Sequence, residues 1–425
     1  MSGITIRIAQ LAVLLVLGAA GPAFAQSQIV SQTGIVPSAE DLEAVGGIHA
    51  HVNFGAAVAL SGSTAAVGIP HDVEEQSLPG PGRVGIYRET KAGWIRTATL
   101  LPSNPNDFRL GHDLDLCGNL AIVAAENSTY VFQRRGVHWR EIKRISPPSP
   151  DSVPGPVVCS SNSFAQSFSK RDDQGQSIAG RVYVYERARG GDFELAAKLR
   201  ASDPNDSIGR SLAMERGIVV AGSESESAYV FVRHGGRWIE RQKLQTAAGS
   251  GSFGAAVGIR DRIIIVGAPN MDVPGGLPFW AEGDAFVYLP HRGMWFESQR
   301  LNPPLPELLP SSGFGSKVEM GRRFAAIGVP VTAADQIRPQ SVVTVFERIG
   351  VEFTPRHAGV SAGPDNETIP DFDMSGRRLI ASEHVSLLFN DRIIGRVTIV
   401  EFEPSSEPAT QTDEEEMNEE QTDED

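Results

Sequence analysis

The sequence predicts an all-β fold, a seven-bladed β-propeller of four-stranded antiparallel blades. Three observations lead to this prediction. One segment pattern recurs seven times within residues 54–403, about once every 50 residues. Each copy contains blocks in which residue types alternate with the period of two that is typical of β-strands. The chain also holds 44 Gly and 28 Pro among its 425 residues, which favours many turns and short strands over long helices.

Residues 1–25 have the features of a cleaved secretory signal peptide. They contain one basic residue, Arg7, then an apolar stretch over 11–20 and an Ala-Phe-Ala sequence at 23–25. A signal-anchor helix is the alternative, but the apolar stretch is shorter than the roughly 20 residues that a membrane span needs. We therefore expect a secreted protein without a membrane span, located in the periplasm, outside the cell or at the cell surface.

The repeat is clearest in its first copy, which begins with Phe54-Gly55 and ends its second apolar run with Gly68-Ile69-Pro70. The same frame recurs at 110–124, 208–222, 253–269 and 314–330, and degenerate copies lie at 158–166 and 373–381. A second block alternates aromatic and β-branched residues, as in Gly180–Arg187. In six copies a Gly-bearing turn then leads to an aromatic residue: Trp94, Trp139, Phe193, Trp238, Trp295 and Phe353. We expect these aromatic side chains to fill the seams between neighbouring blades.

A repeat of about 50 residues with four short strands has the size of one propeller blade. An array of β-sandwiches is the alternative, but a sandwich domain takes about 100 residues and would not repeat at half that length. The seventh copy lacks a fourth strand, so residues 26–53, which include the alternating segment Gln28–Thr33, are expected to close the last blade and to protect its edge. The predicted propeller itself covers residues 54–403.

The repeat resembles a known family. Phe253-Gly254, followed by Gly267-Ala268-Pro269, is similar to the FG-GAP repeat, and the copies that begin at Phe54 and Phe314 match it nearly as well. This repeat builds the propeller of integrin α-subunits and of many exported bacterial proteins. The resemblance covers nearly all of residues 54–403. It implies a secreted or surface propeller of a kind that usually binds proteins or glycans, and it does not point to one conserved catalytic site.

The chain departs from the integrin-like version of this repeat, which carries a calcium loop of the Asp-x-Asp-x-Asp-Gly type. The nearest fragments are Asp113-Leu114-Asp115 and Asp371-Phe372-Asp373, and both lack the third carboxylate and the glycine that wrap an ion. His49-Ala50-His51 has a spacing suited to a metal, but no third ligand is identifiable. We therefore expect neither a metal site nor a cofactor.

Cys117 and Cys159 are the two cysteines of the chain. They occupy the same position in the frames of copies two and three, and equivalent positions of adjacent blades are neighbours near the axis. An exported protein folds in an oxidising compartment, so we expect a disulfide between them; two buried thiols are the alternative.

Residues 404–425 carry ten carboxylates and no Lys or Arg. A segment of this composition cannot bury enough apolar surface to fold, so we expect a disordered acidic tail. The whole chain has a net charge of -14, which argues against a nucleic-acid partner because phosphate binding needs a basic surface.

The sequence contains no GxSxG, Walker, HExxH or CxxC motif and no residue set that predicts catalysis. We expect a monomeric, non-enzymatic binding or adhesion propeller that presents loops to a protein or glycan. Phe279 and Trp280, in the long loop of copy five, are candidate partner-binding residues unless they fold back and are buried. The alternatives are a structural part of an envelope assembly, or a glycan hydrolase or lyase, whose sign would be carboxylates or histidines from several blades converging at the axis.

Overall fold

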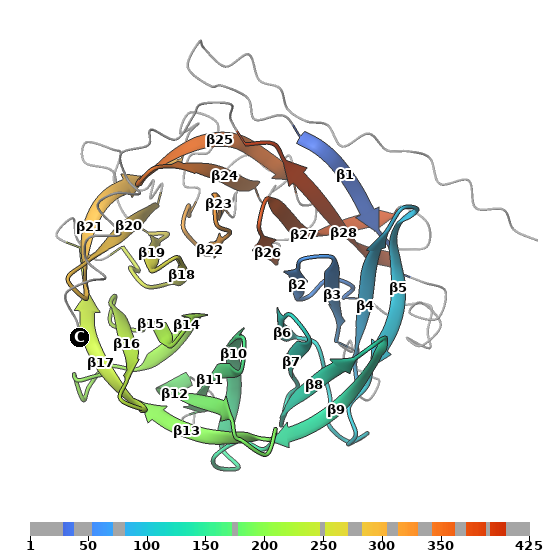
Figure 1. Cartoon of the computed structure of the whole chain (residues 1–425), viewed down its shortest axis with the longest axis horizontal. Helices are drawn as coiled ribbons and strands as arrows, with labels where there is room; N and C mark the ends of the chain where they lie inside the picture. Colours follow the sequence, from blue (N-terminus) through green and yellow to red (C-terminus); the bar gives the residue numbers. More distant parts are fainter. Residues whose placement is uncertain are drawn as a thin grey trace, which may run out of the picture.

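The computed structural model confirms the predicted fold, with seven four-stranded antiparallel sheets in a ring (Figure 1). It describes residues 29–37, 53–70, 81–171, 177–246, 251–270, 283–303, 313–329, 342–361, 371–387 and 392–404. Within these ranges the regular secondary structure is all β, and no helix suited to crossing a membrane is found.

The strands of each blade follow one another from the axis to the rim. Blade 1 consists of β2 (Val58–Ser61), β3 (Thr64–Ile69), β4 (Arg83–Thr90) and β5 (Gly93–Leu100). Blade 2 consists of β6 (Asp113–Cys117), β7 (Leu120–Ala124), β8 (Thr129–Arg135) and β9 (His138–Ile145). Blade 3 consists of β10 (Ser152–Ser160), β11 (Ser163–Arg171), β12 (Ser177–Arg187) and β13 (Phe193–Leu199). Blade 4 consists of β14 (Ile208–Glu215), β15 (Ile218–Ser223), β16 (Ala228–His234) and β17 (Arg237–Leu244).

The remaining blades follow the same plan until the ring closes. Blade 5 consists of β18 (Ala256–Arg260), β19 (Ile263–Ala268), β20 (Asp284–His291) and β21 (Met294–Leu301). Blade 6 consists of β22 (Lys317–Met320), β23 (Phe324–Val329), β24 (Val342–Ile349) and β25 (Glu352–Ser361). Blade 7 consists of β26 (Phe372–Ser375), β27 (Arg378–Leu387), β28 (Arg392–Phe402) and, at the rim, β1 (Ile29–Ile35).

The ring is closed by a strand from the other end of the chain, as the sequence predicted. β1 pairs antiparallel with β28, with Ile35 opposite Val397 and Ile29 opposite Phe402. Ile35 is only 4% exposed and packs with Phe54 and Val397 in the seam between blades 7 and 1. The first strand of the chain thus completes the blade that contains the last strands: β1 covers the edge of β28 and becomes the outer strand of blade 7 (Figure 1).

The glycines of the repeat lie where the backbones of adjacent blades touch. A Cβ on Gly267 of β19 would lie 1.9 Å from the carbonyl oxygen of Gly315, which opens blade 6. Gly68 and Gly222 make the same approach to the first glycine of the following blade, at 2.0 and 1.9 Å. Gly315 has a φ of +94°, a conformation that residues with a Cβ rarely adopt. The repeating Phe-Gly and Gly-x-Pro elements are therefore the two halves of one inter-blade contact.

Aromatic side chains fill the seams between blades, as predicted. Trp295 is 2% exposed, lies in the cluster shared by blades 4 and 5, and donates its indole N–H to the carbonyl oxygen of Arg262 at 2.6 Å. The other five predicted aromatic residues pack in the equivalent clusters of their own seams: Trp94, Trp139, Phe193, Trp238 and Phe353. Each apolar core is consequently shared by two blades, and a blade does not have a core of its own.

Cys117 and Cys159 form a disulfide between blades 2 and 3, with their Cα atoms 6.0 Å apart. The bond was predicted, but the assumption that the two cysteines occupy equivalent positions in their blades was wrong: they are offset by one residue. In each blade, the last residue of the first strand pairs with the first residue of the second strand across a tight turn. This residue is Cys117 in blade 2, paired with Leu120, and Ser160 in blade 3, paired with Ser163, so Cys117 is equivalent to Ser160 and not to Cys159. Because side chains alternate along a strand, the offset turns Cys159 back toward blade 2 while Cys117 faces blade 3. Two cysteines at the same frame position would point the same way around the ring.

Deleting residues 26–36 should destabilise the propeller. The deletion exposes the edge of β28 and removes the buried Ile35 side chain, so we expect the free energy of unfolding to fall by at least about 2 kcal/mol. Thermal unfolding followed by circular dichroism measures this loss. Val30, 53% exposed on the same strand, provides the control: Val30→Ser should leave the midpoint nearly unchanged. A deletion variant with an unaltered midpoint would show that β1 does not fasten the ring.

Replacing Gly267 by Ala should lower the free energy of unfolding by about 1–3 kcal/mol, because the new methyl group meets the backbone of Gly315. Gly190 is the control, since no atom lies within 4 Å of its Cβ position. Denaturant titration of Gly267→Ala and Gly190→Ala compares the two sites. Equal effects would contradict the inter-blade explanation of the repeat.

Candidate functional site: the axial cavity

The first strands of the seven blades surround a cavity of about 950 Å³ on the ring axis. These strands are β2, β6, β10, β14, β18, β22 and β26, and they are the innermost strands in Figure 1. Each is the edge strand of its sheet, so one row of its backbone N–H groups faces away from its own blade. The cavity wall is therefore built from strand edges whose hydrogen bonds must be satisfied by side chains or water.

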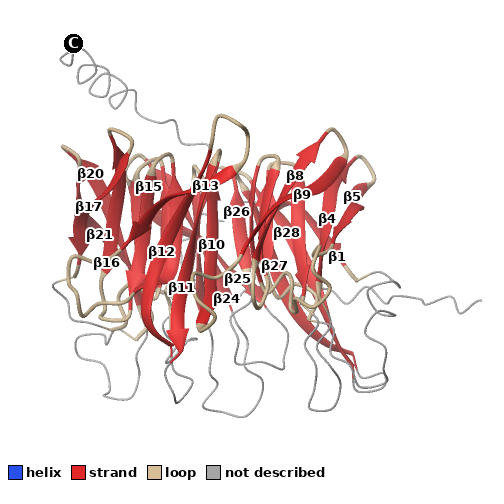
Figure 2. Cartoon of the chain, turned by 90° about the horizontal axis from the view of Figure 1, so that it is seen from below, coloured by secondary structure: helices blue, strands red, loops and turns tan. Residues whose placement is uncertain are grey.

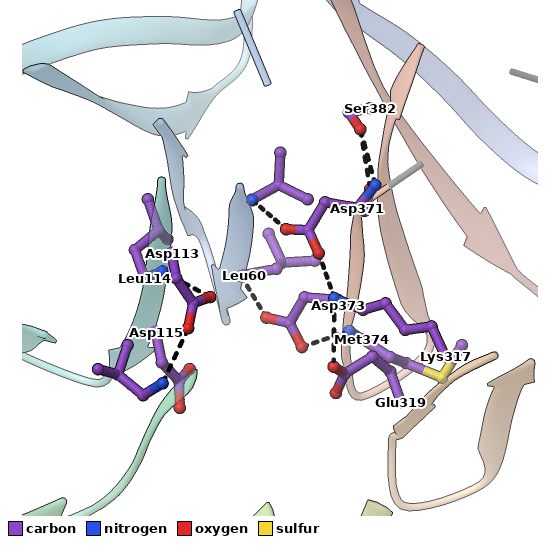
Figure 3. A network of polar contacts seen from close by, with 12 residues as sticks. Leu60, Asp113, Leu114, Asp115, Lys317, Glu319, Asp371, Asp373, Met374 and Ser382 are labelled. Atoms are coloured by element: carbon purple, nitrogen blue, oxygen red, sulfur yellow. Dashed lines mark hydrogen bonds and ion pairs between the residues drawn. The ribbon is translucent and has the colours of Figure 1, made fainter. Parts of the chain in front are cut away.

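Six charged side chains from three blades meet on one side of this cavity, and we call them the axial charge cluster (Figure 3). They are Asp113 and Asp115 of β6, Lys317 and Glu319 of β22, and Asp373 of β26 together with Asp371 just before it. Five carboxylates thus share one lysine. In the other blades the aligned positions carry uncharged residues, such as Ala57 and Ala59 in blade 1.

The aspartates of the cluster hold the edge of the next blade. Asp371 accepts a hydrogen bond from the backbone N–H of Val58 at 2.5 Å, and Asp373 accepts one from that of Leu60 at 2.6 Å. Each lies in blade 7 and reaches the inner strand of blade 1 (Figure 3).

Blade 2 uses the same device toward blade 3. Asp113 accepts from the N–H of Val157 at 2.8 Å, and Asp115 accepts from that of Cys159 at 2.7 Å. The second oxygen of each carboxylate accepts from the backbone N–H of the following residue, Leu114 or Leu116. These aspartates consequently satisfy backbone donors at the free edge of the neighbouring sheet.

Lys317 is the cation of the cluster. Its ammonium group forms an ion pair with Asp371, lies 3.7 Å from Glu319, and sits 5.3 Å from the centre of the Phe372 ring. Burial opposes the charge of Lys317, but the attraction of Asp371 and Glu319 outweighs it and raises the pKa of the lysine. Lys317 is therefore charged at neutral pH and offsets part of the negative charge.

The carboxylates of the cluster hold their protons more tightly than exposed ones. Burial in the narrow cavity raises the pKa of Asp113 to about 7, against the lowering effect of its hydrogen bond from Val157. Burial, reinforced by the charge of Asp373, raises the pKa of Asp115 to about 7 as well. Burial also raises the pKa of Glu319 well above its ordinary value, although Lys317 pulls in the opposite direction. Partial exposure to the cavity, 33% for the Glu319 side chain, lets water moderate these effects.

The structure brings together residues that the sequence analysis had noted separately or missed. The two Asp-x-Asp fragments, considered there as incomplete calcium loops, lie on or beside inner strands and face one cavity. Lys317 and Glu319 were not identified. An alignment of the seven copies would have identified them. At the two positions equivalent to Ala57 and Ala59, charged residues occur only in copies two, six and seven.

Metal ligation has one geometric candidate in the described part of the chain: Asp115, Cys117 and Cys159, whose ligand atoms lie within 4.8 Å of one another. The two sulfur atoms are joined in the disulfide, so thiolates are not available to an ion. The His49-Ala50-His51 pair and the loop residues Phe279 and Trp280 lie outside the described residues.

Comparison with models of known protein families gives no match to the chain, and a search of curated proteins finds none that matches it.

Replacing Glu319 by Gln should stabilise the protein increasingly as the pH rises. A carboxyl with a raised folded-state pKa makes folding less favourable once the unfolded chain loses its proton, so its unfavourable contribution grows from about pH 4.5 upward. We expect Glu319→Gln and the native chain to have similar stabilities near pH 4 and to differ by on the order of 1 kcal/mol at pH 8. Melting temperatures measured across this pH range give the difference.

Glu194, exposed on the rim strand β13, is the matched control, and Glu194→Gln should shift the melting temperature little. A Glu319→Gln variant that is less stable than the native chain at pH 8 would show that attraction to Lys317 outweighs burial and repulsion.

Proposed function

We propose that this chain is a secreted, non-enzymatic β-propeller of the FG-GAP type that binds a protein or glycan partner, in the periplasm or at the cell surface. The observation that carries the proposal is the use of the axial aspartates. Asp113, Asp115 and Asp373 each accept backbone N–H groups with both carboxylate oxygens. Groups held in this way serve the ring itself, which leaves recognition to the surfaces that the ring presents.

The shared construction of the blades supports the same proposal. The apolar cores lie between blades, the last blade is closed by β1, and a disulfide joins blades 2 and 3. A scaffold connected in this way holds the strand ends from which the connecting loops leave at fixed distances from one another, which suits binding through several loops at once. The contact between Gly267 and Gly315 gives a physical reason for the pattern that resembles the FG-GAP repeat.

Partner binding should depend on the long loop of blade 5. Replacing Phe279 and Trp280 together by Ala is expected to weaken binding at least about fivefold, since adjacent aromatic residues are frequent binding hot spots. Capture on glycan arrays and on immobilised proteins of the cell envelope identifies the partner, and titration then measures the affinity. Phe296 provides the control because it is 56% exposed on the rim strand β21, and Phe296→Ala should bind normally. Lost stability with retained binding would show that Phe279 and Trp280 belong to the core.

A second candidate, an enzyme that cleaves extracellular glycans, is favoured by one specific observation. Carboxylates from blades 2, 6 and 7 converge at the axis, and burial raises the pKa of Glu319, as a general acid requires. Glu319 is also the cluster carboxylate that holds no backbone N–H group among the described residues. Turnover of an oligosaccharide that Glu319→Gln abolishes, while binding is kept, would establish this candidate and contradict the non-enzymatic proposal.

A further inference from the structure

One face of the propeller carries a ring of arginines. The turns between first and second strands and between third and fourth strands all lie on this face, because successive strands of an antiparallel blade run in opposite directions. We call it the turn face; Figure 2 shows the disc edge-on, with the strands running between its two faces. Ten exposed arginines lie in or next to these turns: Arg88, Arg135, Arg189, Arg216, Arg233, Arg237, Arg262, Arg292, Arg322 and Arg377. Every blade contributes at least one of them.

Fewer carboxylates than arginines are exposed in or next to these turns, among them Asp192, Glu352 and Glu403. Glu186 pairs with Arg233 at 2.7 Å, and Glu401 pairs with Arg377 at 2.6 Å. The other eight arginine side chains make no ion pair with any described residue. An exposed guanidinium keeps its charge at all physiological pH values, so the turn face is permanently basic.

The described part of the opposite face shows no comparable excess of arginines. Its connections and strand ends expose the carboxylates of Glu126, Asp151 and Glu224 and five cations, which are Arg109, Lys170, Arg181, Arg200 and Arg210. A net charge of -14 for the whole chain is thus compatible with a basic turn face.

The acidic segment 404–425 leaves the fold at the turn face. β28 is the third strand of blade 7, so its last residue, Phe402, lies at the level of the turns that carry the arginines. The segment holds ten carboxylates: Glu407, Asp413, Glu414, Glu415, Glu416, Glu419, Glu420, Asp423, Glu424 and Asp425. Its 22 residues span up to roughly 70 Å when extended, whereas the four strands of a blade, at a spacing of about 4.8 Å, cover only about 14 Å. The segment is thus long enough to reach the arginines of several blades.

We propose that the turn face is a docking surface for the chain's own acidic segment 404–425. Charge complementarity provides the attraction, and the covalent connection supplies an effective concentration in the millimolar range, which favours this segment over a free polyanion. The docked segment covers the arginines of the turn face and leaves the loops of the opposite face open. Docking weakens with ionic strength because exposed charges are screened within about 8–10 Å at physiological salt.

The test compares two full chains, the native one and a variant in which the ten carboxylates of the segment are replaced by Gln or Asn. The probe is a fluorescein-labelled synthetic peptide with the sequence of residues 404–425, and fluorescence anisotropy measures its binding. We expect saturable binding to the neutralised chain and binding at least about tenfold weaker to the native chain, whose own segment occupies the face. Raising the salt from about 50 to about 500 mM should weaken binding to the neutralised chain at least tenfold.

Substitutions on the two faces locate the contact. In the neutralised chain, Arg216→Gln, Arg262→Gln and Arg322→Gln combined should weaken peptide binding at least about fivefold, because they remove three cations from the turns between first and second strands. Arg181→Gln with Arg210→Gln, on the opposite face, should leave it unchanged. Equal loss in both sets, equal binding to native and neutralised chains, or no binding of the peptide would overturn the proposal. Binding of heparin but not of the peptide would assign the face to an external polyanion instead.

Discussion

The close approach of two glycine backbones at the seam between blades is the constraint on which the rest of the structure depends. Gly68, Gly222 and Gly267 each place a Cα against the carbonyl oxygen of the first glycine of the following blade, with no room for a side chain. This contact fixes how far apart successive sheets stand near the axis. The large apolar residues in the wider, outer part of each seam, such as Trp295 and Phe353, are then buried between the two sheets.

A ring built in this way leaves seven strand edges facing its own centre. Blades 7 and 2 satisfy part of these edges with aspartates that reach the backbone of the next blade, as Asp373 does with Leu60 and Asp115 with Cys159. These aspartates gather negative charge in a confined cavity, and burial raises the pKa values of Asp115 and Asp373. Lys317 offsets part of the charge, so the axis combines a structural role with an electrostatic cost that depends on pH.

The same topology also gathers exposed arginines on one face. Turns of one kind lie on one face, and their short two-residue connections carry arginines such as Arg216 and Arg262. The connections between second and third strands differ in length from blade to blade, and the one in blade 5 contains Phe279 and Trp280. Under the two proposals made above, the partner and the acidic segment use different faces of the ring.

The sequence by itself determined the number of blades, the strand order within them, the seam aromatics and the closing strand, because alternation, glycine placement and repeat length are signals local to each copy. It favoured a disulfide over two buried thiols, but it did not give the geometry of the bond, since the one-residue offset of Cys159 follows from strand register. Only the tertiary structure decided that Asp113, Glu319 and Asp373 share one cavity and that the arginines share one face. Closure of the ring creates both arrangements by bringing together residues that are far apart along the chain.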